Sequence, residues 1–435
     1  MDETIDLFCG WPNPGLLPTD ALSDAFAAVM RDPSIRTPGL MYGPDEGFEP
    51  LRQHIAQWLT SFYNPTSGAV TGDRICITGG ASQNIACILQ VFSDPAYTRN
   101  VWVVAPTYHL VCRIFDDAGF AGRLKAIPQY QDGNLDLEYL RREMAAAEEA
   151  SVEPGKEPTD PLRPWARLYK HVVYATPAFS NPSTVTMSLS DREDLVRLAR
   201  EFDALVIADD VYDSLQWPSN PEEPLEQQAT ALFPRLVDVD RYLDGGPRND
   251  WGNVISNGSF SKLIGPGIRT GWVEGTAKLA YGISQAGCQR SGGAPSQFSS
   301  TMVDQLVSSG FLQRHIDTVL RPAYSSRYYT LMSAIQTYLI PLGVTLPFIG
   351  PPVAGGYFVW AALPAPLRAS DLAATAVQGH GVKVAAGDLF RVQGDPAARN
   401  RFESYVRLCF AWEPEEKLAE GVRRVGNAIR EMTRQ

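Results

Sequence analysis

The stretch SFSKLIGPGIRTGW contains a lysine and an arginine seven residues apart, Lys262 and Arg269. Two serines, Ser259 and Ser261, precede the lysine, and a Gly-Pro-Gly sequence separates it from the arginine. A surface helix does not tolerate that break, because glycine costs about 1 kcal/mol and proline about 3 kcal/mol in a helix interior. The stretch therefore predicts a specialised backbone that presents one amine, a group that can form an imine with an aldehyde.

Four other apolar runs are each followed by residues that could bind a ligand. After RICITGG, NVWVVAP, HVVYATP and DALVIA come, in that order, Ala81-Ser82, Tyr108, Asn181, and Asp209 with Tyr212. Each has an ordinary structural explanation: a capped helix start, a ring that closes the core, a loop turn and a helix N-cap. A helix start also binds phosphate, however, a tyrosine can stack on a flat ligand, and a buried carboxylate usually has a cationic partner.

These residues make one coherent site if the runs are parallel strands of a single sheet. Ligands of such sheets bind outside the carboxyl ends of the strands. The site would then combine a phosphate cradle, a stacking ring, a hydroxyl partner, an acid and a lysine. Pyridoxal 5′-phosphate requires that combination, so we predict it as the cofactor. Lys262 would form the imine and Asp209 would pair with the pyridinium nitrogen.

The elements that position these residues alternate between strand and helix from about residue 74 to residue 275. The runs RICITGG, NVWVVAPTY, KHVVYATP, DALVIADD, NVISNGSF and TGWVEG predict strands buried on both faces. SQNIACILQVF, HLVCRIFDDAG and SDREDLVRLAREFD predict helices, the last beginning at Ser190 with Glu193 completing a capping box. The alternation predicts an α/β fold with a doubly wound, mostly parallel sheet.

The chain is expected to divide into three parts. Residues 1–45 would join a small domain and the substrate pocket, 46–300 would form the large cofactor domain, and 301–435 would form a smaller α+β domain. The last part contains long helical patterns and the strand-like runs AGGYFVWAAL and SYVRLCFAW. Two proline-rich and acidic stretches, 145–165 and 217–236, indicate surface insertions or loops.

Composition limits the function classes. A net charge of −11 over 435 residues argues against nucleic acid or an anionic membrane surface as the main partner. The six cysteines are scattered, with no CxxC or Cys/His pairing, so we expect neither a disulfide framework nor a metal site. MDETIDLFCG lacks the features of a signal peptide, and no apolar run reaches membrane-spanning length. These features predict a cytoplasmic protein.

The sequence resembles the fold-type I pyridoxal-phosphate enzymes, class I and II aminotransferases, along nearly its whole length. Its most specific motif is the S-x-S-K-x-x-x-P-G-x-R-x-G run around Lys262. CGWPNPGLLP and LMYGPDEGFEPLRQHIA are similar to fungal-type members of the kynurenine/aminoadipate aminotransferase branch. The resemblance implies a homodimer that moves an amino group between an L-amino acid, aromatic or aminoadipate-like, and a 2-oxo acid.

The resemblance also implies a role for each matching residue. Lys262, Asp209 and Tyr108 would be catalytic, with Tyr108 stacked on the cofactor ring and Asn181 and Tyr212 bonded to its hydroxyl. The phosphate would be held by Ala81, Ser82, Ser259, Ser261 and Arg269, and by Tyr42 of the neighbouring subunit. The substrate would meet Arg407, Asn181, Gly10 and Trp11, with Arg407 gripping the α-carboxylate.

The turn that carries Asn181 departs from the family pattern. Where the family has Asn-Pro-Thr/Ser-Gly, this chain has Asn181-Pro182-Ser183-Thr184. We expect the loss of glycine to alter the turn. Two positions are considered for Trp11. In the substrate pocket it would leave room for a large or apolar substrate side chain, and a position in the hydrophobic core is an equal alternative.

Other protein classes fit the residues less well. Ser259 to Lys262 also spells S-x-x-K, as in penicillin-binding enzymes, but the S-D-N and K-T-G motifs are missing. Gly265, Gly267 and Gly271 do not have the G-x-G-x-x-G spacing of nicotinamide-binding domains. Regulators with this fold carry an N-terminal DNA-binding domain, whereas this chain starts on the aminotransferase pattern. Within the fold, decarboxylation, elimination or replacement, and ring-forming condensation in a biosynthetic pathway remain alternatives.

Overall fold

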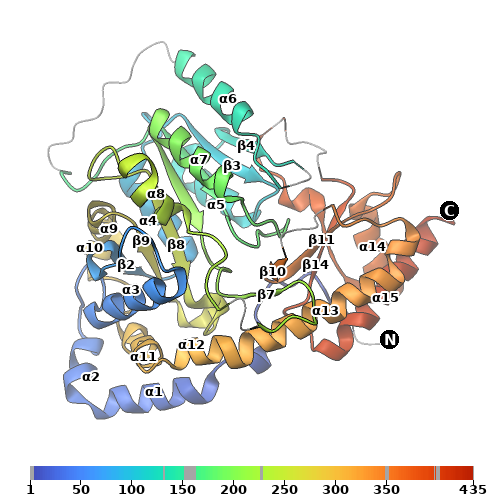
Figure 1. The fold of residues 1–435 in the computed structure, drawn as a ribbon, viewed down its shortest axis with the longest axis horizontal. Coiled ribbons are helices and arrows are strands. Elements are labelled where there is room, and N and C mark those ends of the chain that lie inside the picture. Colours follow the sequence, from blue (N-terminus) through green and yellow to red (C-terminus); the bar gives the residue numbers. More distant parts are fainter. Residues whose placement is uncertain are drawn as a thin grey trace.

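The computed structural model describes residues 4–130, 133–150, 163–225, 229–347, 352–395, 397 and 402–434 (Figure 1). Most of the predicted insertion at 145–165, and part of the one at 217–236, therefore lies outside the described residues. The helices are α1 (Thr19–Arg31), α2 (Pro33–Leu40), α3 (Glu49–Tyr63), α4 (Ala81–Phe92), α5 (Leu110–Phe115), α6 (Leu137–Glu149), α7 (Leu189–Glu201), α8 (Leu236–Tyr242), α9 (Ala277–Ser284), α10 (Gly287–Arg290), α11 (Gln297–Ser308), α12 (Phe311–His315), α13 (Arg321–Tyr338), α14 (Ala369–His380) and α15 (Glu415–Met432). The strands are β1 (Ile5–Asp6), β2 (Ile75–Thr78), β3 (Asn100–Ala105), β4 (Leu124–Pro128), β5 (His171–Ala175), β6 (Ala204–Asp209), β7 (Gln216–Pro218), β8 (Val254–Ser259), β9 (Gly271–Glu274), β10 (Val353–Gly355), β11 (Phe358–Ala362), β12 (Val382–Lys383), β13 (Ala385–Ala386) and β14 (Tyr405–Cys409).

A seven-stranded sheet with the order β2-β9-β8-β6-β5-β3-β4 forms the centre of the molecule. β9 runs antiparallel to both of its neighbours, and the other neighbouring pairs are parallel. All six predicted strands are present, which confirms the predicted α/β class and the mostly parallel sheet. The edge strand β4 was not predicted from the sequence.

The sheet is buried on both faces because alternate strand residues enter different cores. In β5, Val172 and Tyr174 pack with residues of α4, α5 and α9. Val173 and Ala175 pack on the other face with residues of α6, α7 and α8. Continuous apolar runs are typical of parallel strands covered by helices on both faces, which is why these runs were recognisable as strands.

One predicted helix start was wrong by two residues. α7 begins at Leu189, and the Oγ oxygen of Ser188 accepts the backbone N–H of Asp191 at 3.1 Å. Ser190, the predicted cap, lies inside the helix, with its hydroxyl 3.1 Å from that of Ser188. Ser188 has the extended backbone that an N-cap requires, so its hydroxyl reaches the third amide of the helix.

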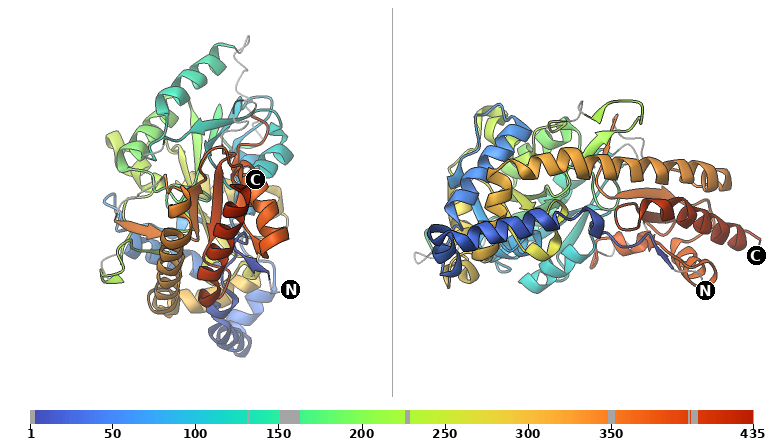
Figure 2. Two further views of the ribbon diagram at one scale, coloured as in Figure 1. Left: turned by 90° about the vertical axis from the view of Figure 1, so that its right-hand side faces the viewer. Right: turned by 90° about the horizontal axis from the view of Figure 1, so that it is seen from below.

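A second, smaller sheet with the order β11-β14-β13 lies beside the large one and packs with α13, α14 and α15 (Figure 1). The N-terminal strand β1 pairs with β12, so the chain begins on this side of the molecule. Figure 2 shows both termini at the same end and the long helix α13 running lengthwise along the molecule. Among the described residues, no helix is both long and apolar enough to cross a membrane.

Candidate active site

Lys262 lies immediately beyond the carboxyl end of β8, in a short 3-10 turn, Phe260–Lys262. The turn is held by Ser259, whose Oγ accepts the backbone N–H of Ser261 at 3.2 Å and donates to its hydroxyl at 2.9 Å. The Lys262 amine donates to the backbone oxygen of Gly10 at 3.0 Å. The predicted special backbone therefore exists, and it points the lysine toward the N-terminal segment.

The surroundings of Lys262 favour the neutral amine. Burial lowers its pKa to about 8, and the nearby Arg407 guanidinium acts in the same direction. Asp209 and Cys409 act in the opposite direction but do not compensate for the desolvation. A lysine with such a pKa loses its proton far more easily than an exposed lysine, as a nucleophilic amine requires.

Asp209 ends β6, the strand that pairs with β8, and lies opposite Asn257 in the register. Its two carboxylate oxygens accept the Asn257 amide at 2.9 Å and the Tyr174 hydroxyl at 2.6 Å. Burial raises the pKa of Asp209 to about 6, while these hydrogen bonds lower it. The side chain is therefore largely ionised at neutral pH. The adjacent Asp210 bonds instead to Ser256 at 2.5 Å.

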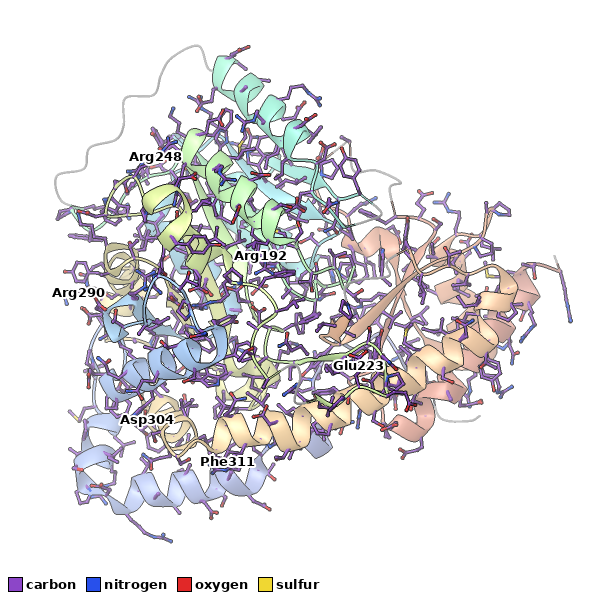
Figure 3. The ribbon with its side chains drawn as sticks, in the orientation of Figure 1. Arg192, Glu223, Arg248, Arg290, Asp304 and Phe311 are labelled. Atoms are coloured by element: carbon purple, nitrogen blue, oxygen red, sulfur yellow. The ribbon has the colours of Figure 1, made fainter. Side chains whose placement is uncertain are left out.

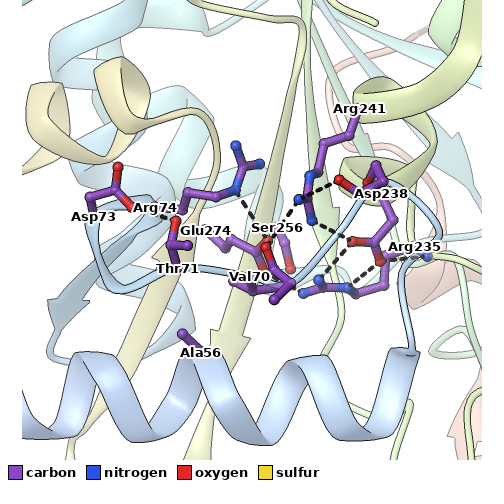
Figure 4. A network of polar contacts seen from close by, with 12 residues as sticks. Ala56, Val70, Thr71, Asp73, Arg74, Arg235, Asp238, Arg241, Ser256 and Glu274 are labelled. Atoms are coloured by element: carbon purple, nitrogen blue, oxygen red, sulfur yellow. Dashed lines mark hydrogen bonds and ion pairs between the residues drawn. The ribbon is translucent and has the colours of Figure 1, made fainter.

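Arg235, Asp238 and Glu274 form a buried network of charges (Figure 4), which Tyr63 connects to the segment after β6. Asp213 accepts the Tyr63 hydroxyl at 2.9 Å, and the Arg235 guanidinium lies over the Tyr63 ring at 4.1 Å from its centroid. Arg235 bonds to both carboxylate oxygens of Asp238, at 2.9 and 3.0 Å, and to Glu274 at 2.5 Å. Arg235 is paired with two carboxylates, and Tyr63 connects it to Asp213, so the network can fix the loop after Asp209 that carries Tyr212.

The start of α4 lies beside Arg269. The helix begins at Ala81 after Gly80, whose φ of +108° suits glycine. A side-chain carbon added at Gly80 would lie 3.0 Å from Nη2 of Arg269, so the guanidinium rests against the helix start. Arg269 itself has a φ of +48° and donates to the oxygen of Pro266 at 3.1 Å. Ser82 is exposed and does not cap the helix.

This arrangement has the features of an anion site. β8 and β9 pair Ser259 with Gly271, and a side-chain carbon at Gly271 would lie 2.7 Å from the Cα atom of Gly80. The serine turn, the Arg269 guanidinium and the amides at the start of α4 therefore meet at one point.

Arg407, in β14, provides a buried guanidinium near Lys262. It is 4% exposed and lies over the rings of Phe358 and Phe390, 4.1 and 4.7 Å from their centroids. Its two terminal nitrogens donate to Asn181 Oδ1 at 2.8 Å and to the oxygen of Phe8 at 2.6 Å. Its Nε atom has no hydrogen-bond partner, and no carboxylate of the described residues forms an ion pair with it. A ligand carboxylate would complete this site.

The loop after β5 carries Asn181, which is 7% exposed. Thr184, in the position where the family has glycine, adopts a φ of +64°. The turn therefore keeps a left-handed backbone conformation at this position. Glycine adopts that conformation readily, whereas the β-branched threonine disfavours it. Tyr212 is buried against Tyr357, with 5.6 Å between ring centroids, and Tyr108 is partly buried.

Four predicted site residues lie at the surface, and Arg269, described above, is one of them. Trp11 is 61% exposed and contacts Trp412 edge to face, with 5.7 Å between centroids, so the core position considered for it is wrong. Tyr42 is 87% exposed, so within one chain it projects into solvent. Ser82 is also exposed. Gly10, in contrast, is close-packed, because a side-chain carbon there would lie 2.9 Å from the Phe358 ring.

Several residues that contribute to this region were not predicted from the sequence. Tyr174 and Asn257 had a detectable signal, since each is a polar residue inside a strand buried on both faces. Phe8, Phe358 and Phe390 had no such signal, because phenylalanine rings are common in any hydrophobic core.

The described residues fit pyridoxal 5′-phosphate. The set includes a partly buried amine, an ionised buried acid, a guanidinium at a glycine-led helix start, and a second guanidinium whose Nε atom is without a partner. These groups match the aldehyde, ring nitrogen and phosphate of the cofactor and the carboxylate of an amino acid.

Comparison with known proteins agrees with this chemistry. The family model of aminotransferase class I and II matches residues 18–425. An uncharacterized Saccharomyces cerevisiae protein is 35% identical, over 98% of this chain and 96% of its own length. Aromatic-amino-acid aminotransferase 1 of Thermococcus litoralis is 28% identical over 99% of this chain and 88% of its own. The solved structure of Pyrococcus horikoshii kynurenine aminotransferase has a TM-score of 0.78 and 27% identity, covering 99% of this chain and 92% of that one. The chain belongs to the class I and II aminotransferases, and it is a pyridoxal-phosphate-dependent transaminase of fold type I.

Proposed function

We propose that this transaminase moves the amino group of an L-amino acid with an aromatic side chain to a 2-oxo acid, with Lys262 at the reacting centre. The observation that carries the proposal is the arrangement of Lys262 and Arg407. Both side chains donate to backbone oxygens of one short N-terminal stretch, at Gly10 and Phe8, at 3.0 and 2.6 Å. A substrate whose α-carboxylate bound Arg407 would therefore have its α-amino group close to Lys262.

Pyridoxal 5′-phosphate, when bound, supplies an electron sink for the electron pair that the substrate α-carbon retains when it loses its proton. Asp209 would keep the ring nitrogen protonated, since its carboxylate is buried and ionised at neutral pH. Asn181 and Tyr212 would bond to the ring hydroxyl, and Tyr108 would pack on the ring. The phosphate would be bound by Ala81, Ser82, Ser259, Ser261 and Arg269.

Lys262 would also move the proton in the chemical step. Its Nζ atom would accept the proton from the substrate α-carbon and return it later in the half-reaction. Burial lowers the pKa of this amine to about 8, so it can exchange a proton near neutral pH.

The walls near Arg407 support an aromatic substrate. Phe8, Phe358 and Phe390 surround the guanidinium, with centroids 5.8, 4.1 and 4.7 Å from its carbon. Aromatic rings favour contact with another ring. An aminoadipate-like substrate would require a further cation for its second carboxylate. The relatives named above as acting on aromatic amino acids and on kynurenine point in the same direction.

We further propose a homodimer with shared sites. Leu40, Met41 and Tyr42 are 59, 63 and 87% exposed, and three consecutive exposed apolar side chains suit a subunit interface. Tyr42 would reach the partner's phosphate site. We also propose the three-part division of the chain that the sequence predicts, with boundaries at residues 45 and 300. A role in cytoplasmic amino-acid metabolism or biosynthesis is proposed on the same basis.

An amino-donor panel tests the substrate proposal. The holoenzyme would be incubated with 2-oxoglutarate and phenylalanine, tyrosine, tryptophan, kynurenine or 2-aminoadipate, and the keto products measured by mass spectrometry. We expect aromatic donors to have the highest kcat/KM. A preference for 2-aminoadipate would overturn the aromatic assignment.

Borohydride reduction tests the lysine independently of the substrate. Reduction should attach the cofactor permanently to the peptide that contains Lys262. An adduct on Lys278 or Lys383 instead would show that the reacting amine is elsewhere.

A further inference from the structure

Two cysteines distant in sequence lie in contact, one in the middle of α4 and the other in α10. The Sγ atoms of Cys87, in α4, and Cys288, in α10, are 3.5 Å apart although 201 positions separate the residues. Cys87 is 1% exposed, whereas Cys288 is exposed. α10 is the short helix that also carries Arg290, which Figure 3 labels. One buried and one accessible thiol therefore face each other.

Neighbouring contacts hold the two thiols together. Gln289, next to Cys288, donates from Nε2 to the oxygen of Ile77 in β2 at 2.8 Å, which fixes α10 to the large sheet. Gln83, one turn before Cys87, contacts the sulfur of Cys288 at 4.0 Å and accepts the backbone N–H of Gly79. A disulfide has its sulfurs about 2.05 Å apart, so the existing contact would have to close by about 1.5 Å.

We propose that Cys87 and Cys288 form a reversible intrachain disulfide when the protein meets hydrogen peroxide. The Cys288 thiolate attacks one peroxide oxygen, the O–O bond breaks, and the leaving hydroxide takes up a proton to become water. Cys288 is then a sulfenic acid. The Cys87 sulfur loses its proton and attacks the Cys288 sulfur, the S–O bond breaks, and a second water leaves. Two thiols are oxidised, and one peroxide is reduced to two waters.

The order of the two steps follows from exposure. Burial raises the pKa of the Cys87 thiol, so it reacts slowly with an external oxidant. Cys288 is accessible and reacts first, and its contact with Cys87 then makes the second step intramolecular. Such a bond would be transient in a reducing compartment, as redox-responsive disulfides in the cytosol are.

Peptide mapping of the peroxide-treated holoenzyme tests the proposal. After remaining thiols are alkylated, a digest without reductant should contain one linked pair of peptides, holding Cys87 and Cys288, that dithiothreitol separates. Cys288→Ser should abolish the linked pair. In Cys87→Ala, Cys288 should stop at the sulfenic acid and be trapped by dimedone. Cys112→Ala, a change at another buried cysteine, is the matched control and should keep the linked pair.

A thermal measurement adds a second readout. The bond would close a loop of about 200 residues and thereby restrict the unfolded chain, so oxidation should raise the apparent Tm by a few degrees. The rise should be reversed by dithiothreitol and be absent in Cys288→Ser. Cys288 recovered only as sulfinic or sulfonic acid, a Cys288–Cys288 link between subunits, or an unchanged or lower Tm on oxidation would each overturn the proposal.

Discussion

Arg407 donates from Nη1 to the Oδ1 oxygen of Asn181 at 2.8 Å, although 226 positions separate the two residues. Because an arginine can only donate, this bond fixes the orientation of the Asn181 amide. The amide nitrogen must then face away from Arg407, where it can donate to a ligand oxygen. The contact also ties β14 of the small sheet to the loop after β5 of the large one, so the residues proposed to bind substrate and cofactor are positioned together.

Arg407→Leu should weaken every amino-acid substrate, whatever its side chain, because the α-carboxylate is common to all of them. Removing one partner of a buried charged pair costs roughly 2–5 kcal/mol, which should appear in kcat/KM across the donor panel. Arg423→Leu, an exposed change on α15, is the control and should have little effect. A loss confined to one class of donor would assign Arg407 to side-chain recognition instead.

Asp209→Asn should preserve the fold and cofactor binding while kcat falls by about 100-fold or more, since an amide does not stabilise a protonated ring nitrogen as a carboxylate does. Its partners Tyr174 and Asn257 can bond to an amide after small rotations, so circular dichroism should be unchanged. The surface variant Asp20→Asn serves as the control. Turnover like that of the unaltered enzyme would indicate Asp210, or neither acid, as the ring-nitrogen partner.

Capture of pyridoxal 5′-phosphate by the apoprotein should depend on pH through Lys262. Burial lowers the pKa of this amine to about 8, and only the neutral amine attacks the aldehyde. The capture rate should therefore rise about tenfold per pH unit below 8 and level off above it. Because the unfolded lysine keeps its proton up to about pH 10.4, stability of the apoprotein should also rise between pH 8 and 10.4.

Stopped-flow absorbance of the bound chromophore would measure this rate. Asp209→Asn removes a negative charge that raises the Lys262 pKa, so its midpoint should move to lower pH. A midpoint near 10 in the unaltered protein would mean that Lys262 is exposed to water in the apoprotein.

Much of this site was predictable because its chemistry lies at strand ends. Lys262, Asp209 and Asn181 each follow an apolar run, and the topology of a parallel sheet brings such positions to one edge. Contacts that depend on packing between distant segments were not predictable. Nothing in the sequence indicates that the Phe8 carbonyl would accept Arg407. The edge strand β4 and the two-residue shift of the helix cap from Ser190 to Ser188 depend on local contacts that periodicity does not resolve.

Thr184→Gly should stabilise the protein. Thr184 has a φ of +64°, which costs a residue with a side chain roughly 1–2 kcal/mol, whereas glycine adopts it readily. Greater freedom of glycine in the unfolded chain offsets part of the gain, so we expect a net increase of about 1 kcal/mol in the free energy of unfolding. Thr184→Ala shortens the same side chain without relieving the backbone and is the control. Equal effects of the two changes would attribute the gain to the side chain rather than to the backbone.

Tyr42 should complete the phosphate site of the partner subunit. Its side chain is 87% exposed in one chain, and two-fold symmetry would make the donation reciprocal. A Tyr42→Phe chain and a Lys262→Ala chain, each inactive as a homodimer at limiting cofactor, should then recover activity when mixed. In the hybrid, one site collects both changes and the other collects neither.

The two changes can also be arranged to give the opposite result. A chain with both Tyr42→Phe and Lys262→Ala, paired with an unaltered chain, forms a hybrid in which each site has one change and neither is intact. Hybrids purified by two different affinity tags should therefore show about half the activity of the unaltered dimer in the first arrangement and little in the second. If Tyr42 acts within its own subunit, the two arrangements exchange their results, because the doubly changed chain then leaves its partner's site untouched. Equal activity in both would mean that Tyr42 does not contribute to the site.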